Sequence, residues 1–154
     1  MPKRYSYRRY YGSRDKYSVE QTAGNLLLGN SDYDGAITVV PPADVQGMRK
    51  VKHITISLSN TTQSGSTDCY WALVYVPAGT SPSALNISTS GGNMYEPNQY
   101  VMSCGLFEFS GGPLRISSPL ARNLNSGDQV ALLIHSTSVG AHIGYVCRYA
   151  ITLQ

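Results

Sequence analysis

Charged side chains are scarce in this chain of 154 residues, of which only 14% are Asp, Glu, Lys or Arg. Soluble domains ordinarily carry about 25%, so Ser, Thr, Asn, Gly and Tyr must cover much of the surface. Lys and Glu, which are good helix formers, are rare after the first sixteen positions. Val, Ile and Thr, together with twelve tyrosines, are plentiful instead. This balance favours β-strands over helices.

Long apolar runs and paired cysteines are also missing. No stretch approaches the ~20 apolar residues of a membrane-spanning helix, so we expect no membrane insertion. The basic N-terminus is not followed by an apolar segment, so the sequence does not predict a secretory signal. The three cysteines, Cys69, Cys104 and Cys147, cannot all pair within one chain. Each lies in an apolar run, and we expect three buried free thiols in a reducing compartment.

Sequence motifs of catalysis and of metal or cofactor binding are absent. The chain contains no G-x-S-x-G elbow, Walker loop, dinucleotide fingerprint or H-E-x-x-H helix. Its histidines are scattered without a carboxylate or cysteine at a fixed spacing. His135 alternates with apolar neighbours, which indicates a structural role, and His142 lies between glycines in an expected turn. The sequence therefore predicts no enzyme, and we assign no catalytic residue, metal ligand or cofactor.

Short β-like segments separated by turn residues follow one another from residue 17 onward. The expected strands span about residues 17–28, 35–40, 49–58, 69–76, 100–109, 114–118, 129–137 and 145–153. The fourth is apolar on both faces, so we expect neither face to meet water. Eight short strands without an amphipathic helix favour an all-β, two-sheet antiparallel sandwich, and in particular a single eight-stranded jelly roll. We expect an arm over residues 1–16 and a jelly-roll domain over residues 17–154.

The N-terminal arm is the strongest functional signal. It holds six of the twelve Lys and Arg residues and one acid, Asp15, whereas the rest of the chain has six basic and eight acidic residues. Apart from Met1 it has no aliphatic side chain, so we expect it to be disordered when free. Lys and Arg neutralise phosphates, and tyrosine rings stack on unpaired bases. The arm therefore suits single-stranded nucleic acid, and a solubilising or nuclear-import tail is the alternative.

A second basic group follows in the segment 49–58. Strict alternation predicts that Lys50, Lys52 and Ile54 share one face, while Arg49 and His53 share the other. The group could line the surface next to the arm, or it could be an ordinary solvated strand end. The residues predicted to bind nucleic acid are Lys3, Arg4, Tyr5, Tyr7, Arg8, Arg9, Tyr10, Tyr11, Arg14, Lys16, Arg49, Lys50 and Lys52.

Several segments, in their order along the chain, resemble one viral protein family. After the Arg/Tyr-rich arm these are Met94–Pro97, Val101–Gly105, Pro113–Ser118 and Arg122–Asp128. Together they resemble the capsid proteins of circular, Rep-encoding single-stranded DNA viruses, the group that includes circoviruses and nanoviruses. The resemblance extends over the whole chain, although this arm is shorter and has fewer arginines than the arms of many circovirus-like members.

The resemblance implies a jelly roll that assembles with itself into an icosahedral T=1 shell of about sixty copies. It also implies an arm directed at packaged circular single-stranded DNA, a virion location and entry into the host nucleus; a host-cell receptor is not identified. Two alternatives remain open. One is the coat protein of a small RNA satellite virus. The other is a jelly-roll carbohydrate-binding module, in which Trp71 and the loops 59–67 and 81–93 would line a cleft.

Overall fold

The structure is a computed structural model that describes residues 17–28, 34–61, 68–82, 100–108, 112–137 and 140–153. These residues form strands and turns, with no helix among them. The strands are β1 (Ser18–Leu27), β2 (Asp34–Val40), β3 (Arg49–Asn60), β4 (Asp68–Val76), β5 (Tyr100–Glu108), β6 (Leu114–Ser118), β7 (Arg122–Leu124), β8 (Gln129–Ser136) and β9 (His142–Leu153). In this part of the chain no helix could cross a membrane. The predicted arm, residues 1–16, lies outside the described residues.

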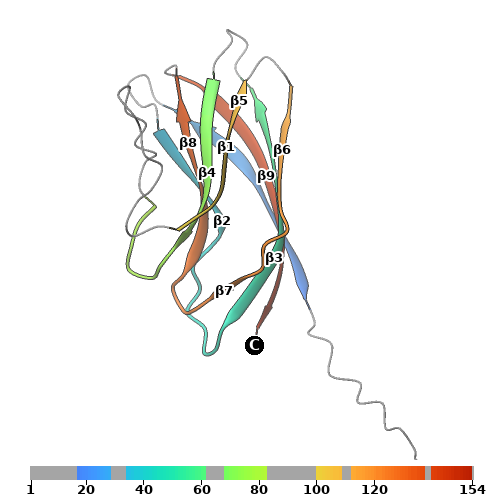
Figure 1. Cartoon of the computed structure of the whole chain (residues 1–154), viewed down its shortest axis with the longest axis vertical. Coiled ribbons are helices and arrows are strands. Elements are labelled where there is room, and N and C mark those ends of the chain that lie inside the picture. The colour runs from blue at the N-terminus through green and yellow to red at the C-terminus, as the bar shows by residue number, and fades with distance from the viewer. Residues whose placement is uncertain are drawn as a thin grey trace, which may run out of the picture.

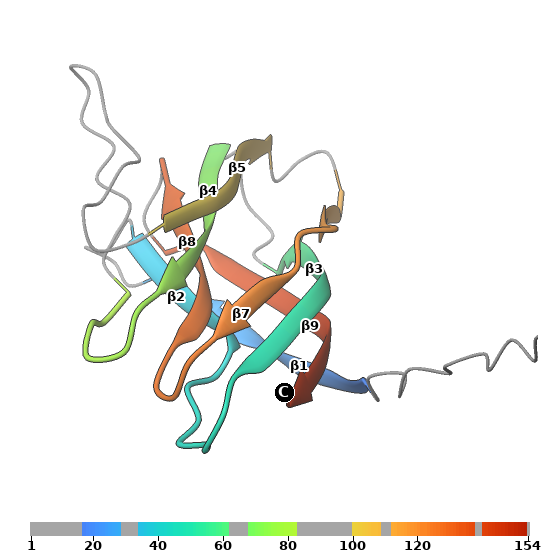
Figure 2. The same ribbon diagram turned by 60° about the horizontal axis from the view of Figure 1, so that its bottom comes forward.

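Two antiparallel sheets form the described domain (Figure 1). In sheet A the strand order is β1-β9-β3-β6, and β7 pairs with another part of β3. In sheet B the order is β2-β8-β4-β5. Figure 2, in which the lower end comes forward, shows the strands of sheet B on one side and those of sheet A on the other. The predicted all-β, two-sheet antiparallel sandwich is thereby confirmed.

The structure has nine strands in its described part, rather than the predicted eight. Each expected strand overlaps an observed one, and the additional strand is β7. Three residues are too few for alternation to be recognised, and β7 is held by pairing of Leu124 with Arg49 and of Arg122 with Val51. The turn expected at His142 is also wrong, because this residue already belongs to β9 and pairs with Leu27 of β1.

The inner faces of the two sheets enclose one hydrophobic core. Val51, Ile54 and Ile56 of β3 and Leu132 and Ile134 of β8 are fully buried in it. Complete burial of one such side chain stabilises the folded state by about 1.5–3 kcal/mol relative to exposure. These side chains hold β3 and β8, which lie in the interior of their sheets, together across the core.

Strand β4 is buried on both faces. Trp71 and Leu73 point into the main core, whereas Ala72, Val74 and Val76 belong to a second buried cluster on the other face of sheet B. The prediction that neither face of this segment meets water is confirmed. Trp71 is 8% exposed and is therefore a core residue.

Strand β3 contains a bulge that changes which of its side chains face the core. Its register with β9 shifts between Lys52 and Thr55, and His53 has a φ of 54°. A residue other than glycine seldom adopts this left-handed conformation, and an inserted residue disrupts the regular alternation. Val51 before the bulge and Ile54 after it are both buried. The prediction that Lys52 and Ile54 share a face was therefore wrong.

A buried carboxylate joins three loops at the lower end of the sandwich in Figure 1. Asp128, 3% exposed, accepts hydrogen bonds from the Tyr75 hydroxyl (2.7 Å) and from the backbone N–H groups of Asn125 (2.7 Å) and Ala78 (3.0 Å). The Gly127 N–H beside it donates to the Ala43 carbonyl at 3.1 Å. The connections β2–β3, β4–β5 and β7–β8 are thus tied together at one point.

Burial alone would raise the pKa of Asp128, but the hydrogen bonds from Tyr75, Asn125 and Ala78 outweigh burial and hold that pKa below its ordinary value. Burial, together with the hydrogen bond to Asp128, raises the pKa of Tyr75 to about 12. Both shifts favour a charged carboxylate beside a neutral phenol at neutral pH.

Replacing Asp128 by Ala removes the acceptor of three hydrogen bonds. We expect Asp128→Ala to lower the free energy of unfolding by roughly 3 kcal/mol, because each unsatisfied buried donor costs about 1–3 kcal/mol. Asp128→Asn keeps one acceptor oxygen and should lose less. Urea denaturation measures both variants. An Asp128→Ala protein as stable as the wild type would contradict the role given to this carboxylate.

The lowered pKa of Asp128 also gives stability a pH dependence of definite sign. A carboxyl group with a lower pKa in the folded state stabilises it fully above the unfolded pKa of about 4. That stabilisation is lost as the pH falls through the folded pKa. We expect the urea midpoint of the wild type to fall more steeply below about pH 4 than that of Asp128→Asn. Parallel declines would show that Asp128 does not cause the dependence.

Candidate nucleic-acid interface

The structure separates the three predicted nucleic-acid-binding residues of β3. Lys50 and Lys52 project from the outer face of sheet A, the face turned away from the core, and each is half-buried. Arg49 precedes the bulge on the core side and is 7% exposed. The other ten predicted residues belong to the arm and lie outside the described residues. Only the two lysines are therefore brought together on a surface.

Arg49 is engaged inside the molecule. Its guanidinium donates hydrogen bonds to the Pro41 carbonyl at 2.9 Å and to the Asp128 carbonyl at 2.8 Å. These bonds fix the β2–β3 connection against the turn before β8. The predicted contact of Arg49 with nucleic acid does not fit this placement, because a phosphate would have to displace one part-buried and one buried hydrogen bond. Arg49 therefore has a structural role, which is to hold the β2–β3 connection against the turn before β8.

Lys52 contacts the first described residue after the arm. Its ammonium nitrogen lies 3.5 Å from the centroid of the Tyr17 ring, within the range of a cation–π interaction. Tyr17 directly precedes β1, so the basic arm joins the domain beside the two half-buried lysines. The point at which the arm joins the domain is therefore adjacent to the basic surface of sheet A.

Two arginines that the sequence did not single out complete this surface. Arg148 of β9 lies opposite Thr55 of β3, and Arg115 of β6 lies opposite Ser57. Directly opposite residues of antiparallel strands share a face, so both arginines project outward, and both are exposed. Each alternates with apolar neighbours that are buried or partly buried in its strand, and this alternation was a usable signal. Which strands lie next to β3 could not be read from that alternation.

The acidic residues of the described chain lie elsewhere. Four of its six Lys and Arg residues are on the outer face of sheet A, where the described residues place no carboxylate. Glu20 of β1 pairs with the buried Tyr149 and so belongs to the inner side. Asp34, at the start of β2 in sheet B, lies 2.7 Å from Nδ1 of His135. This partner supports the structural role predicted for His135. The two sheets thus differ in charge.

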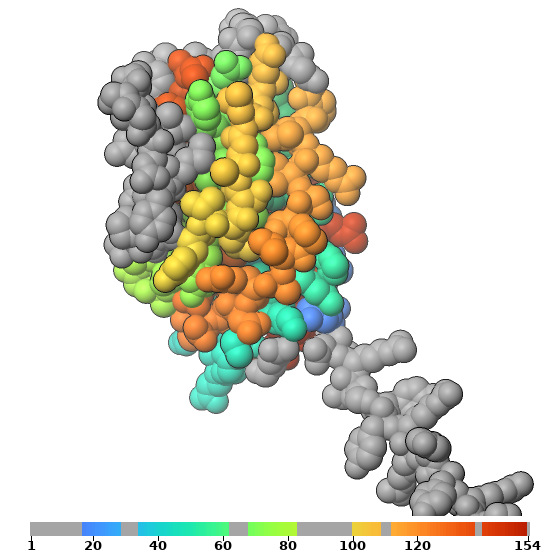
Figure 3. Space-filling view, in the orientation of Figure 1, coloured from blue at the N-terminus to red at the C-terminus, as the bar shows by residue number. Residues whose placement is uncertain are grey.

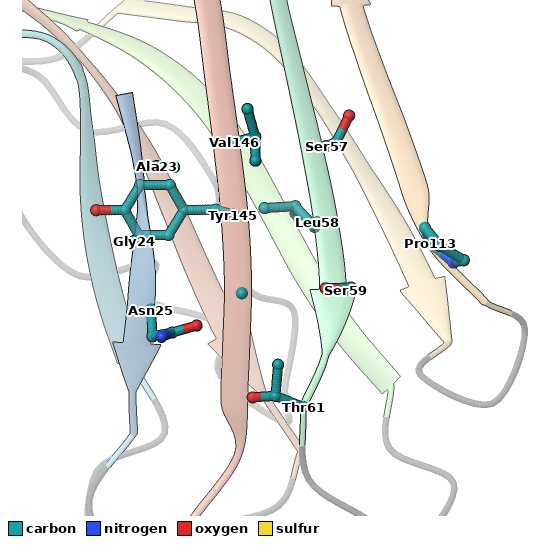
Figure 4. Close-up of a pocket in the computed structure, with 11 residues that line it drawn as sticks. Ala23, Gly24, Asn25, Ser57, Leu58, Ser59, Thr61, Pro113, Tyr145 and Val146 are labelled. Carbon is teal, nitrogen blue, oxygen red and sulfur yellow. The ribbon is translucent and has the colours of Figure 1, made fainter. Parts of the chain in front are cut away.

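Beyond the basic residues, the outer face of sheet A is hollowed into an uncharged trough of about 610 Å³. Uncharged residues of β1, β3 and β9 line it, and they include the polar Asn25, Ser57 and Ser59 and the larger Leu58, Tyr145 and Val146 (Figure 4). The absence of a side chain at Gly144 leaves the bottom of the trough open. A Cβ at this position would approach the Ser59 hydroxyl to 3.2 Å and the Asn25 amide oxygen to 3.3 Å. The face therefore has a basic half and an uncharged half.

The outer face of sheet B is apolar by contrast. Its buried cluster around Val74 continues toward the edge strand β5, where Val101 is 37% and Leu106 is 56% exposed. Figure 3 shows β5 running along the visible surface of the molecule. Val101 lies opposite Val74, and Leu106 lies opposite Tyr70. One outer face of the sandwich thus suits a polyanion, and the edge of the other suits a protein surface.

The described residues contain no group of three or more His, Cys, Asp or Glu side chains arranged to hold a metal ion. Comparison with known protein families and with curated proteins found no match for this chain. Function is therefore inferred from the fold and from the chemical character of its surfaces.

The three cysteines have different surroundings. Cys69 and Cys147 are buried, and burial raises the pKa of each thiol to about 11. Cys104 is exposed on β5, so the prediction that all three are buried was wrong for this residue. It lies opposite Ala72 on the outward side of an edge strand, a position that sequence pattern alone does not distinguish from a central strand.

These surroundings predict selective alkylation. Unassembled native protein treated with iodoacetamide at about pH 8 should be modified at Cys104, because only thiolates react and the other two thiols stay protonated and covered. After unfolding in urea, all three cysteines should react. Mass spectrometry counts and locates the adducts. Equal rates at Cys104 and Cys147 in the native protein would contradict the burial described.

Proposed function

We propose that this chain is a viral coat protein whose jelly-roll domain assembles into a small icosahedral shell and whose basic arm packages circular single-stranded DNA. The protein would act in the virion and in the host nucleus during assembly. One observation carries the proposal: the basic arm joins the domain at the outer face of sheet A, beside four exposed or half-exposed basic side chains. A nucleic-acid strand held by the arm would meet this face next.

The order of strand pairing supports a jelly roll. The first strand pairs with the last (β1 with β9) and the second with the last but one (β2 with β8). Further inward along the chain, β3 pairs with β6 and β7, and β4 pairs with β5. This is the pattern of one long antiparallel hairpin rolled into two sheets, as in viral capsid domains. In that interpretation β6 and β7 are two parts of a single interrupted strand.

The charge distribution supports a role in packaging. About sixty copies would supply on the order of 500 positive charges from the arms and the sheet A faces together. A genome of one to a few thousand nucleotides would exceed that charge. We therefore expect a small genome or genome segment, or bound inorganic cations or polyamines beside a larger one.

The remaining surface supports self-assembly. Subunit contacts favour apolar and uncharged polar groups that can be buried without isolating a charge. Leu27, Tyr100, Leu106, Leu120 and Leu153 are each at least half exposed in the single chain. With charged residues at 14% of the sequence, much of this surface can be buried at low desolvation cost.

The same surfaces bear on the two alternatives, a carbohydrate-binding module and a coat protein that packages RNA. A carbohydrate-binding module loses its main aromatic candidate, because Trp71 is packed in the core against Gly105. Of the loops 59–67 and 81–93 assigned to that cleft, residues 62–67 and 83–93 lie outside the described residues. RNA in place of DNA fits the basic face equally well, since phosphate contacts and stacking occur with both. The resemblance to single-stranded DNA virus capsids favours DNA.

Purified full-length protein should form uniform shells in negative-stain electron microscopy. Deleting residues 2–16 should leave shells but reduce the nucleic acid they contain at least tenfold, because six of the basic side chains are removed. Absorbance at 260 and 280 nm and extraction of the contents measure the packaging. A monomer or trimer that binds glycans would overturn the coat-protein proposal. Normal packaging by the truncated protein would overturn the role of the arm.

Stacking and charge can be separated within the arm. We expect replacement of Tyr5, Tyr7, Tyr10 and Tyr11 by Ser to weaken binding of a single-stranded oligonucleotide while leaving the salt dependence of binding unchanged. Each lost stacking contact costs about 1–3 kcal/mol, whereas the salt slope depends on neutralised phosphates. Replacement of the arm's Lys and Arg by Gln is the matched control and should flatten the slope. Unchanged affinity of the Ser variant would exclude stacking.

A further inference from the structure

A pocket of about 330 Å³ opens on the basic half of sheet A's outer face. Its lining includes Val19, His53, Thr55, Arg115 and Arg148. We propose that this pocket binds a backbone phosphate of the single-stranded nucleic acid, as a second contact beside the arm. This proposal rests on the proposed packaging function and assigns part of it to Arg115 and Arg148, which the sequence had not indicated, and to His53.

Two guanidinium groups flank the pocket. Arg148 lies opposite Thr55, and Arg115 lies opposite Ser57, so the two arginines approach β3 from its two sides in adjacent rows of the sheet. The described residues provide neither with an ion pair. Guanidinium groups match phosphate oxygens with paired, charge-assisted hydrogen bonds. Two such groups around one concavity, without a described carboxylate in the lining, form a site for an anion.

The third polar group, His53, reaches the pocket through the bulge. Its backbone has a φ of 54°, a conformation that costs energy in a residue with a side chain. Strained conformations of this kind are concentrated at binding and catalytic sites. The bulge turns His53 to the outer face next to Lys52, and His53 is exposed there. Its imidazole adds a ring nitrogen donor to the two arginines.

The pocket also lies on the path from the arm. Tyr17 contacts Lys52, and Val19, two residues further along β1, already lines the pocket. Successive residues of a strand advance about 3.3 Å, so a nucleic-acid strand bound by the end of the arm lies within one or two nucleotides of Arg148. The pocket therefore extends the arm's interaction onto the rigid sheet.

The test compares full-length variants for binding a twenty-nucleotide oligo-dT by fluorescence anisotropy over a range of salt concentrations. Each phosphate contact contributes about 0.7 to the salt slope of single strands, which amounts to about fivefold in affinity near 0.1 M salt. Arg115→Gln and Arg148→Gln should each lose that much, and the double variant about twenty-five-fold. Arg148→Lys keeps the charge without the guanidinium and should lose less than Arg148→Gln.

Arg122→Gln is the matched control for net charge. The Arg122 guanidinium lies 4.4 Å from the centroid of the Tyr75 ring, where β7 approaches β4, and away from the pocket. It should change oligo-dT affinity less than twofold. If the wild type binds oligo-dT but the double variant behaves like Arg122→Gln, the pocket proposal is wrong and the packaging function stands. If the wild type fails to bind oligo-dT at low salt, both proposals fail.

Two further measurements distinguish the pocket's ligand and the role of His53. Heparin binding measured on the same variants shows whether a sulfated glycan is preferred; a loss confined to heparin would overturn the proposal. His53→Gly should melt at the same or a higher temperature, because glycine accepts a positive φ, yet bind oligo-dT about threefold more weakly. Unchanged binding by His53→Gly would remove His53 from the site.

Discussion

The bulge at His53 is the constraint on which the rest of the structure depends. Before it, the core side of β3 carries Arg49 and Val51; after it, the core side carries Ile54 and the aliphatic residues that follow. Arg49 is thereby directed to the carbonyls of Pro41 and Asp128, where it helps to fix the loops at one end of the sandwich. The same irregularity leaves the lysines and His53 on the outer face. One inserted residue therefore determines both the closed end of the core and the basic surface.

The two outer faces of the sandwich have opposite chemical character, so the domain has one side suited to nucleic acid and another suited to protein contacts. Sheet A presents Lys50, Lys52, Arg115 and Arg148 together with the attachment of the arm. Sheet B is apolar on its outer side, with a buried cluster around Val74 and with exposed Val101 and Leu106 on its edge strand β5. A shell subunit needs such a difference between its sides, because one side must contact nucleic acid while its edges contact other subunits. The proposed function follows from this asymmetry and from the strand pairing, and from no single residue.

The sequence was sufficient for the all-β class, the two-sheet arrangement and the position of eight strands, because apolar alternation and turn residues are local signals. It failed where the outcome depends on neighbours distant in the chain. The face of Arg49 follows from a bulge that no composition signal marks, and β7 exists only through its pairing with β3. Arg115 and Arg148 were missed because their common face is defined by register across three strands. Cys104 was misplaced because edge and central strands have similar patterns.

The most direct test of the account is a cryo-electron microscopy map of the assembled full-length protein with its packaged nucleic acid. We predict a closed shell in which the outer face of sheet A is turned to the interior, with nucleic-acid density against Arg115 and Arg148. The exposed edge strand β5 should lie in contacts between subunits. A shell in which sheet A faces the exterior, or in which its basic residues are buried between subunits without nucleic acid, would contradict the account.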